Sequence, residues 1–92
     1  MRVRWTPAAA DDLENIANYL FEKTPENAAR LIREIYAVPS SVARFPRSGR
    51  VGTKEGTREW VMPSLPYIIV YKVEGTTVNV VRVLHSSQNW PD

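Results

Sequence analysis

The residues best suited to chemistry lie in one short basic segment near the middle of the chain. The stretch RFPRSGR carries Arg44, Arg47 and Arg50 around a proline and a glycine, and Lys54 and Arg58 follow within eight residues. Guanidinium groups bind phosphate and carboxylate oxygens in a bidentate manner, so this density of cations suits an anionic partner. A solvated loop in which Arg50 binds a backbone carbonyl is the alternative. The spacing does not choose between a nucleic acid and an acidic protein as the partner.

Two arginines fall inside segments that we expect to be strands. Arg58 begins the stretch REWVM, and Arg82 lies within NVVRVLH. A charged group in such a strand is costly unless it is paired or its head reaches water. One interpretation is structural, with an ion pair to Glu59 or Glu55, or stacking on Tyr67. The other interpretation is that both guanidinium groups converge on one anionic ligand.

His85 is the only histidine of the chain and ends an apolar run. A lone histidine in this position is more often a hydrogen-bonded structural residue than a catalyst. A pair of histidines is excluded, so any general acid–base pair must recruit a carboxylate or a cation, and Glu55 and Glu59 are the candidates. The chain has no cysteine, no cluster with metal-ligand spacing and no glycine-rich phosphate loop, so we expect no metal and no cofactor.

Two helices are expected ahead of the basic segment. Thr6-Pro7 and Thr24-Pro25 each have the form of an N-cap followed by proline at the first helical position. A short connection makes the helices antiparallel neighbours. Pro39 should end or kink the second helix near residues 37–38. Apolar residues at helical spacing follow each cap: Leu13, Ile16, Ala17 and Leu20 in the first helix, and Ala28, Leu31, Ile32 and Ile35 in the second.

Strands account for the rest of the chain. Alternation predicts a short strand over residues 1–5, and β-branched and aromatic residues predict strands over 58–62, 67–73 and 76–84. A two-residue turn at Glu74-Gly75 would place Tyr71 across from Val78 and Tyr67 across from Arg82. We therefore predict one α+β domain over residues 1–92. Its order is β-α-α-β-β-β, with a helical hairpin packed on a small, largely antiparallel sheet.

Composition narrows the class of protein further. The apolar runs are too short to cross a membrane, and the start MRVRWTPAAADDL lacks the apolar core of a signal peptide. With no cysteine as well, we expect a cytoplasmic protein that binds no membrane. Residues 1–43 carry five Lys/Arg and six Asp/Glu, whereas residues 44–92 carry seven and four. Positive charge is therefore concentrated in the half that holds the basic segment.

Several stretches resemble one known family when they are taken in order. They are WTPAAADDLENIANYL at 5–20, ARFPRSGR at 43–50, TREW at 57–60, PYIIVYKV at 66–73 and VVRVLHSSQNWP at 80–91. Each is weak alone, but together they cover essentially the whole chain and resemble the RelE/ParE superfamily of bacterial toxins from type II toxin–antitoxin systems. The fold of that family is the β-α-α-β-β-β arrangement predicted above.

The resemblance implies a growth-inhibiting toxin that a cognate antitoxin holds inactive in a hetero-oligomeric complex. The antitoxin should be acidic, because it would cover the basic residues together with apolar helix or sheet surface. The target would be DNA gyrase for a ParE-like toxin or the ribosome for a RelE-like toxin, in both cases without a metal or cofactor.

The RelE-like alternative is a ribosome-dependent endoribonuclease that cleaves mRNA. By resemblance, Arg58 and Arg82 match cations that stabilise the transition state of that reaction, and His85 matches a histidine of active members. Glu55 lies where other members place a lysine or a general base. However, Ser86 follows His85, where strong ribonucleases of the family often have a tyrosine.

ParE-like members inhibit DNA gyrase without hydrolytic chemistry, and they retain Arg58 and His85 as residues of the fold. The incomplete catalytic set therefore favours a ParE-like toxin. An inactive toxin kept as an antitoxin-binding partner is a third alternative. In the ParE-like interpretation, the residues that would contact the target or a nucleic acid are Arg44, Arg47, Arg50, Lys54, Asn89 and Trp90.

Overall fold

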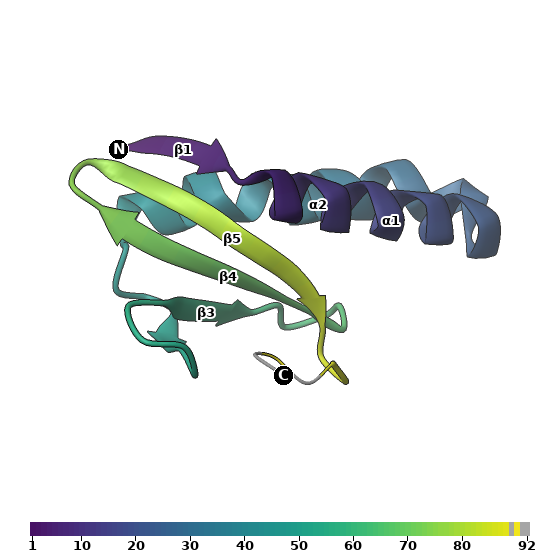
Figure 1. The fold of residues 1–92 in the computed structure, drawn as a ribbon. Helices are drawn as coiled ribbons and strands as arrows, with labels where there is room; N and C mark the ends of the chain where they lie inside the picture. Colours follow the sequence, from purple (N-terminus) through teal and green to yellow (C-terminus); the bar gives the residue numbers. More distant parts are fainter. Residues whose placement is uncertain (89, 91–92) are drawn as a thin grey trace.

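The chain folds as a helical hairpin on one side of a five-stranded sheet (Figure 1). This is a computed structural model that describes residues 1–88 and 90. The predicted order is confirmed, with one short strand added before the strand at Arg58. The elements are β1 (Arg2–Trp5), α1 (Pro7–Lys23), α2 (Pro25–Arg44), β2 (Arg50–Val51), β3 (Arg58–Val61), β4 (Tyr67–Glu74) and β5 (Thr77–His85).

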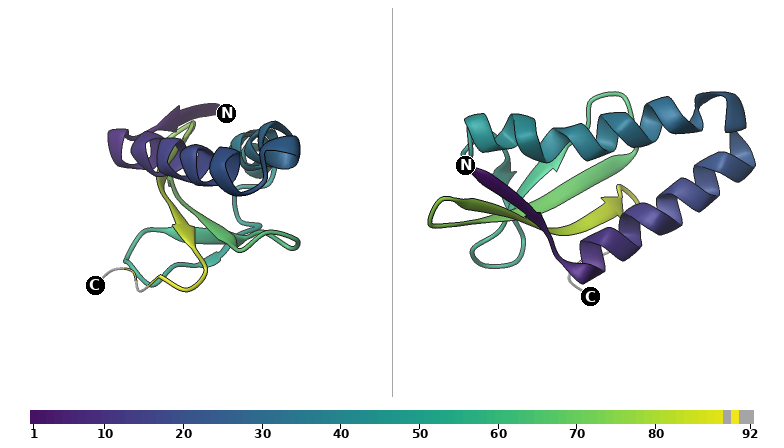
Figure 2. Two further views of the ribbon diagram at one scale, coloured as in Figure 1. Left: turned by 90° about the vertical axis from the view of Figure 1, so that its right-hand side faces the viewer. Right: turned by 90° about the horizontal axis from the view of Figure 1, so that it is seen from above.

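The sheet has the strand order β1-β5-β4-β3-β2. β1 pairs with β5 in parallel, and every other pair is antiparallel, as predicted for a largely antiparallel sheet. β1 covers only residues Thr77–Val80 of β5. Within the described part of the chain, no strand therefore lies beside the outer edge of the second half of β5, and α1 passes there instead (Figure 2).

The two helix starts differ although both have the sequence Thr-Pro. Thr6 accepts a hydrogen bond from the Ala9 amide at 3.1 Å, as the cap motif predicts. Thr24 occupies the N-cap position of α2 without a side-chain cap bond, so that part of the prediction is wrong. Its hydroxyl faces the side chains of Glu26 and Asn27 at 3.4 Å instead.

Pro39 does not end the second helix, because α2 continues to Arg44, so the first of the two predicted outcomes, an end or a kink, is wrong. The proline removes one backbone donor from the helix, at a cost of a few kcal/mol. Its ring is fully buried. Val38, one residue before it, and Val42, three residues after it, both pack into the core. Burial of the ring offsets part of that cost.

The register of the β4–β5 hairpin differs from the predicted one. Glu74 pairs with Thr77, so Gly75 and Thr76 form the two-residue turn, and Gly75 has φ +60°. Glycine supplies the positive φ that such a turn requires at its first central position. The predicted turn placed the glycine second, so next to the turn each predicted partner on β5 lies two residues before the observed one: Val73 was expected across from Thr76 and lies across from Val78.

An irregularity between Val70 and Tyr71 shifts the pairing again. Tyr71 lies across from Val80, Val70 lies across from Arg82, and Val81 is left over as the extra residue of a bulge. As a result Tyr67 faces His85, where the sequence predicted Arg82.

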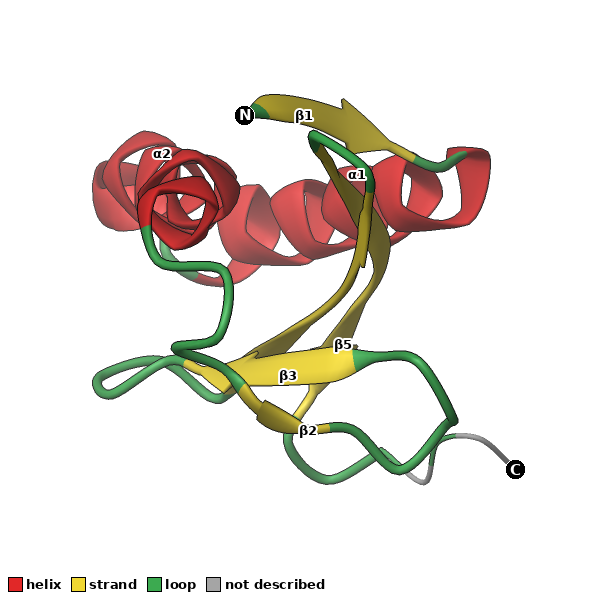
Figure 3. Ribbon diagram, turned by 90° about the vertical axis from the view of Figure 1, so that its left-hand side faces the viewer, coloured by secondary structure: helices red, strands yellow, loops and turns green. Residues whose placement is uncertain are grey.

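The hydrophobic core fills the space between the helices and the facing side of the sheet (Figure 3). Ala9 of α1, Ile35 of α2, Ile69 of β4 and Val80 of β5 are all fully buried in it. No helix among the described residues is long and apolar enough to cross a membrane.

Candidate functional site

The loop between α2 and β2 is held in place by one buried tyrosine. The Tyr71 hydroxyl donates to the Pro46 carbonyl at 2.8 Å and accepts from the Gly49 amide at 2.9 Å. A side chain at position 49 would collide with this ring, because a β-carbon there would lie 2.5 Å from the tyrosine oxygen. The loop thus requires glycine at position 49 and tyrosine at position 71.

Arg58 supports the same loop from β3. Its Nη1 lies 2.8 Å from the Gly49 carbonyl and 3.4 Å from the Arg47 carbonyl. The ion pair with Glu59 or Glu55, one of the alternatives that the sequence left open, is not formed by Arg58, whose acceptors are neutral backbone oxygens. Arg58 binds loop carbonyls in the way that the sequence suggested for Arg50.

Glu59 is a buried carboxylate that pairs with Arg50. The Arg50 guanidinium lies 2.8 Å from Glu59 Oε1, and the Thr53 amide donates to the other oxygen at 3.2 Å. Glu59 lies across from Arg50 in the β2–β3 ladder, which brings their side chains to the same face. The charge of Arg50 is therefore balanced within the fold.

The basic segment divides into cations that hold the fold and cations that face outward. Arg50 and Arg58 belong to the first group. Arg44 and Arg47 are exposed, and Lys54 lies with its Nζ 5.9 Å from the centre of the Trp90 ring. Asn89, which we expected to contact a target, lies outside the described residues.

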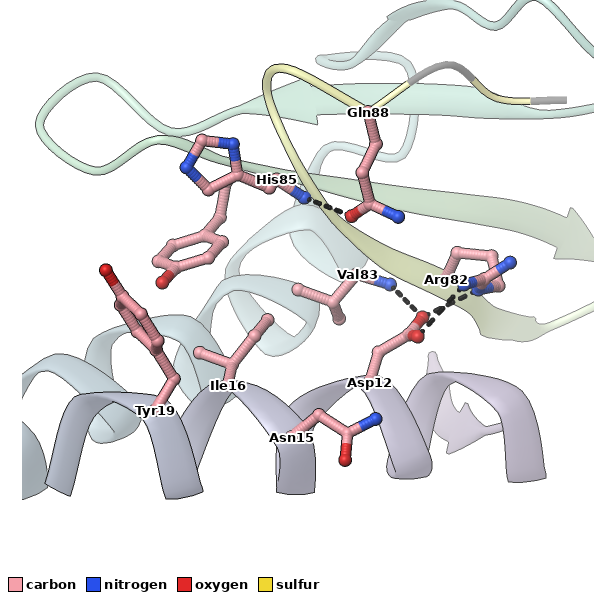
Figure 4. A pocket seen from close by; sticks show the side chains of 9 residues that line it. Asp12, Asn15, Ile16, Tyr19, Arg82, Val83, His85 and Gln88 are labelled. Carbon is pink, nitrogen blue, oxygen red and sulfur yellow. Dashed lines mark hydrogen bonds and ion pairs between the residues drawn. The ribbon is translucent and has the colours of Figure 1, made fainter. Parts of the chain in front are cut away.

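Arg82 is held by a carboxylate of α1 rather than by Tyr67 (Figure 4). Asp12 accepts from Arg82 Nε at 2.7 Å and from Nη2 at 3.0 Å, and it also accepts from the Val83 amide at 2.9 Å. The pair is partly shielded, with 15% of the Asp12 and 30% of the Arg82 side chain exposed. One carboxylate thus neutralises the arginine and satisfies an amide on the uncovered edge of β5.

Arg58 and Arg82 are not brought together. Arg58 lies across from Tyr71 of β4, whereas Arg82 lies across from Val70. The strands that carry them, β3 and β5, are not neighbours, because β4 lies between them. Each then binds a different part of the chain.

A pocket of about 410 Å³ lies between α1 and the end of β5. Tyr67 is its buried wall and meets the His85 ring edge-on, with ring centroids 5.8 Å apart. Burial, and then the nearby Tyr19 hydroxyl, raise the pKa of Tyr67 above its usual 10.0, so the phenol stays protonated at neutral pH. The full lining is Asp12, Asn15, Ile16, Tyr19, Tyr67, Arg82, Val83, His85 and Gln88.

His85 faces its own chain in this pocket. Its Nδ1 lies 2.7 Å from the Ser87 hydroxyl and accepts from the Ser87 amide at 3.2 Å, and its backbone amide donates to Gln88 at 2.8 Å. Glu55 is exposed in the turn before β3 and does not line the pocket. Of the four candidate catalytic residues, only Arg82 and His85 share one site. Among the described residues, no three side chains of the metal-ligating types lie together.

An apolar groove of about 500 Å³ runs between the two helices. Trp5 and Tyr36 stack at one side of it, with ring centroids 5.5 Å apart and planes 13° from parallel. Tyr36 remains 60% exposed. The groove is lined by Trp5, Ala10, Leu13, Glu14, Ala17, Ile32 and Tyr36.

Sequence reasoning gave no functional role to Asp12 or to the aromatic pair. Asp12 precedes Ile16 by four residues, so it lies on the core-facing side of α1, and that position for an acid was an available signal. Tyr36 follows Ile32 by four residues and lies on the groove side of α2 for the same reason. The partner of each residue, however, lies far away in sequence.

The chain is similar in sequence to proteins described as toxins. A family model described as the ParE toxin of type II toxin–antitoxin system, parDE, matches residues 3–90. "Putative toxin Y4kP" of Sinorhizobium fredii is 38% identical over 90 residues, which cover 98% of this chain and 93% of that protein. Toxin RelE2 of Caulobacter vibrioides is 32% identical over 87 residues, which cover 95% of this chain and 97% of that protein.

Solved structures agree on the fold. A chain of the chromosomal ParDE TA system from P. aeruginosa superposes with a TM-score of 0.80 at 24% identity, covering 92% of this chain and 95% of that one. A chain of the toxin–antitoxin complex RelBE2 from Mycobacterium tuberculosis has a TM-score of 0.65 at 26% identity, covering 91% and 95%.

The chain belongs to the ParE toxin family, within the RelE/ParE superfamily. It is a toxin of a type II toxin–antitoxin system, as the resemblance predicted. The two solved structures named above come from toxin–antitoxin systems.

Proposed function

We propose that this toxin arrests growth by binding DNA gyrase and does not cleave mRNA. The observation that carries the proposal is the separation of Arg58 and Arg82, each of which is bonded to its own chain. Cleavage of a phosphodiester would need such cations to converge on one phosphate. Arg82 is instead neutralised by Asp12, and Arg58 is engaged by the loop carbonyls.

Among the described residues no acid–base pair is assembled, which supports the same proposal. Proton transfer requires groups within about 3 Å of the reacting atoms, directly or through one water. His85 is bonded to Ser87, Glu55 lies in an exposed turn elsewhere, and Glu59 is buried with Arg50. A toxin that acts by binding needs none of these groups to be free. Because gyrase acts on the chromosome, this function places the toxin in the cytoplasm.

A RelE-like ribonuclease is the second candidate. It is favoured by the 32% identity to a protein named RelE2 and by the presence of Arg82 and His85 in one pocket. In that case the pocket would have to open, with Asp12 releasing Arg82 when RNA binds.

Pulse labelling after induction of the toxin alone distinguishes these candidates. We expect thymidine incorporation to fall before methionine incorporation, and purified toxin to inhibit supercoiling by gyrase. Collapse of methionine incorporation within minutes, abolished by Arg82→Ala in a protein that still folds, would establish the ribonuclease. Absence of any early effect at a confirmed soluble level would point to an inactive toxin kept for antitoxin binding.

For the antitoxin, we propose that an amphipathic helix of an acidic chain lies in the groove between α1 and α2. An apolar groove between two helices is the kind of surface that receives such a helix. Arg33 follows the lining residue Ile32 on α2 and is exposed, so it offers a cation to an acidic chain. The complex would be a hetero-oligomer.

Blocking the groove tests the antitoxin proposal. Ala17→Arg places a long charged side chain on the apolar lining, and we expect the protein encoded beside the toxin to bind at least about 30-fold more weakly. The matched control is Phe21→Ser, which changes an exposed residue of α1 outside the groove lining. Equal affinity of the two variants would contradict the groove as the binding site.

A further inference from the structure

We propose that the segment Phe45–Val51 is a preformed docking surface for an acidic protein that carries an apolar pocket. The inference rests on the proposed function, because the partner would be the target of the toxin. It assigns the binding energy to Phe45 and Val51, to which no role has been given so far, with Arg44 and Arg47 steering the contact. This segment is called the Phe45–Val51 surface below.

Its apolar side chains are unusually exposed. Val51 is 78% exposed and Phe45 is 69% exposed, the two highest values among the large hydrophobic residues described. One such residue on a surface would need no explanation. Here two occur within seven residues, on a loop whose other groups are used to fix its shape. Aromatic and arginine side chains are also the types most enriched at the centre of protein interfaces.

The segment is held rigid by the residues beneath it. Tyr71 ties Pro46 and Gly49, Arg58 ties Arg47 and Gly49, and the Ser48 amide donates to the Phe45 carbonyl at 2.9 Å. Val51 lies across from Arg58 in the β2–β3 ladder, which brings it to the face where Arg58 supports the loop. A surface fixed in this way loses little conformational entropy when a partner binds.

The charge of the segment selects an acidic partner. Residues 44–54 contain four cations and no Asp or Glu. Glu59 balances Arg50, but Arg58 adds its charge from below, because its hydrogen-bond partners are neutral carbonyl oxygens. Arg44 and Arg47 are exposed. A complementary acidic surface would therefore be attracted and oriented by the toxin.

The same observations favour a protein over a nucleic acid. Binding along a phosphate backbone uses a row of several cations, with aromatic rings to stack on the bases. Arg44, Arg47 and Lys54 are the exposed cations that no carboxylate of the segment balances, and Phe45 is the one aromatic ring between them, since Val51 has no ring that could stack. An apolar anchor flanked by two arginines fits a protein pocket with an acidic rim.

Two variants of the full-length toxin test the surface. Phe45→Ser removes the anchor, and the double variant Arg44→Glu/Arg47→Glu reverses the charge. Growth arrest at matched soluble level, inhibition of supercoiling by purified gyrase, thermal unfolding and antitoxin affinity are measured for each. Phe21→Ser is the matched control, because Phe21 is 52% exposed on α1, away from this segment in the chain.

We expect both variants to lose at least about 30-fold in toxicity and in gyrase inhibition while folding stays unchanged, and Phe45→Ser should also keep its antitoxin affinity. Toxicity of Phe45→Ser equal to that of Phe21→Ser would overturn the proposal. Loss with the charge reversal alone would also overturn it and would indicate a nucleic acid. If the wild type arrests growth without inhibiting gyrase, the gyrase proposal fails. Growth arrest by the variants then still tests whether the Phe45–Val51 surface binds the target.

Discussion

Arg82 in β5 and Arg58 in β3 are both held by hydrogen bonds, but the acceptors differ in charge. On the β5 side, Arg82 binds a carboxylate, so its charge is cancelled by Asp12. On the β3 side, Arg58 binds carbonyl oxygens, so its position is fixed while its charge is kept. Both are ordered arginines in strands, and only the second contributes positive potential to the surface above it.

The difference separates two sides of the molecule. At β5, which we call the closed side, charges and backbone groups are paired within the chain, whereas the β2–β3 side carries the proposed docking surface. Asp12 and Thr6 of the N-terminal region bind backbone groups of β5 where no strand covers its edge, at Val83 and Val81. An uncovered edge invites pairing with other chains, and these contacts prevent it. On the other side, Arg58 and Tyr71 lock a loop that presents Phe45 outward.

Loss of Asp12 should have the largest effect on the closed side. Asp12→Ala leaves the Arg82 charge and the Val83 amide without their acceptor, and we expect the free energy of unfolding to fall by about 2–4 kcal/mol. Urea denaturation measures this directly. The control is Asp11→Ala, an exposed acid one residue earlier, which should change stability by less than about 0.5 kcal/mol. Equal stabilities of the two variants would show that the Asp12 contacts contribute nothing net.

Loss of the Tyr71 hydroxyl should have the next largest effect, on the β2–β3 side. Tyr71→Phe leaves the Pro46 carbonyl and the Gly49 amide unpaired, at a cost of about 1–3 kcal/mol. Hydrogen exchange at the Gly49 amide should become faster, and toxicity should fall with it if the loop must be rigid to bind. Tyr36→Phe, at an exposed tyrosine on α2, is the control. An unchanged exchange rate at the Gly49 amide would show that the Tyr71 hydroxyl does not hold the loop.

The two helix caps give a smaller and more sharply matched comparison. Thr6 caps α1 and also donates to the Val81 carbonyl at 3.1 Å, whereas Thr24 makes no side-chain cap bond. We expect Thr6→Val to lower stability by about 1 kcal/mol and Thr24→Val to lower it by a few tenths. Thermal unfolding of both variants checks the difference. A cost at Thr24 as large as that at Thr6 would mean that the structure assigns the wrong cap.

Local sequence signals were sufficient for the elements and insufficient for their contacts. Thr6-Pro7, the apolar stripes and the β-branched runs place the helices and strands, because each depends on residues within one or two turns of chain. Whether the second helix ends at Pro39 or continues was not predictable, since burial of the proline ring depends on elements that are distant in sequence. The turn at Gly75-Thr76 differs from the predicted one by a single residue, and the bulge after Val70 has no local signal.

The candidate site followed the same division. The density of cations from Arg44 to Arg58 pointed to a special loop, and the loop is indeed ordered and outward-facing. The partners of the cations were not predictable, because Asp12 and Arg82 are 70 residues apart and Tyr71 lies 25 residues from Pro46. Only the assembled sheet brings them into contact and shows which charges are balanced.

The smallest predicted effect lies in the pocket beside Asp12 and concerns alkaline pH. Burial raises the pKa of Tyr67 above 10.0, and the neighbouring Tyr19 adds to it. A raised pKa in the folded state means that the unfolded chain loses its phenolic proton first as pH increases. The corresponding stability is therefore fully present below about pH 10 and is lost as pH rises through the folded pKa.

Urea denaturation of the wild type and of Tyr67→Phe between pH 8 and pH 11 tests this step (a range set roughly by the 10.0 reference value). The free energy of unfolding of the wild type should fall more steeply with pH than that of the variant. The free energy of unfolding of Tyr19→Phe should fall with an intermediate slope. This variant removes the contribution of the Tyr19 hydroxyl to the raised pKa of Tyr67 and leaves the contribution of burial. If the free energy of unfolding falls with the same slope in all three proteins, Tyr67 is accessible to water in solution, and the pocket beside Asp12 is open rather than closed. Toxicity should be unchanged in Tyr67→Phe at neutral pH. The proposed Phe45–Val51 surface lies at the β2 edge of the sheet, whereas Tyr67 lines the pocket at the end of β5.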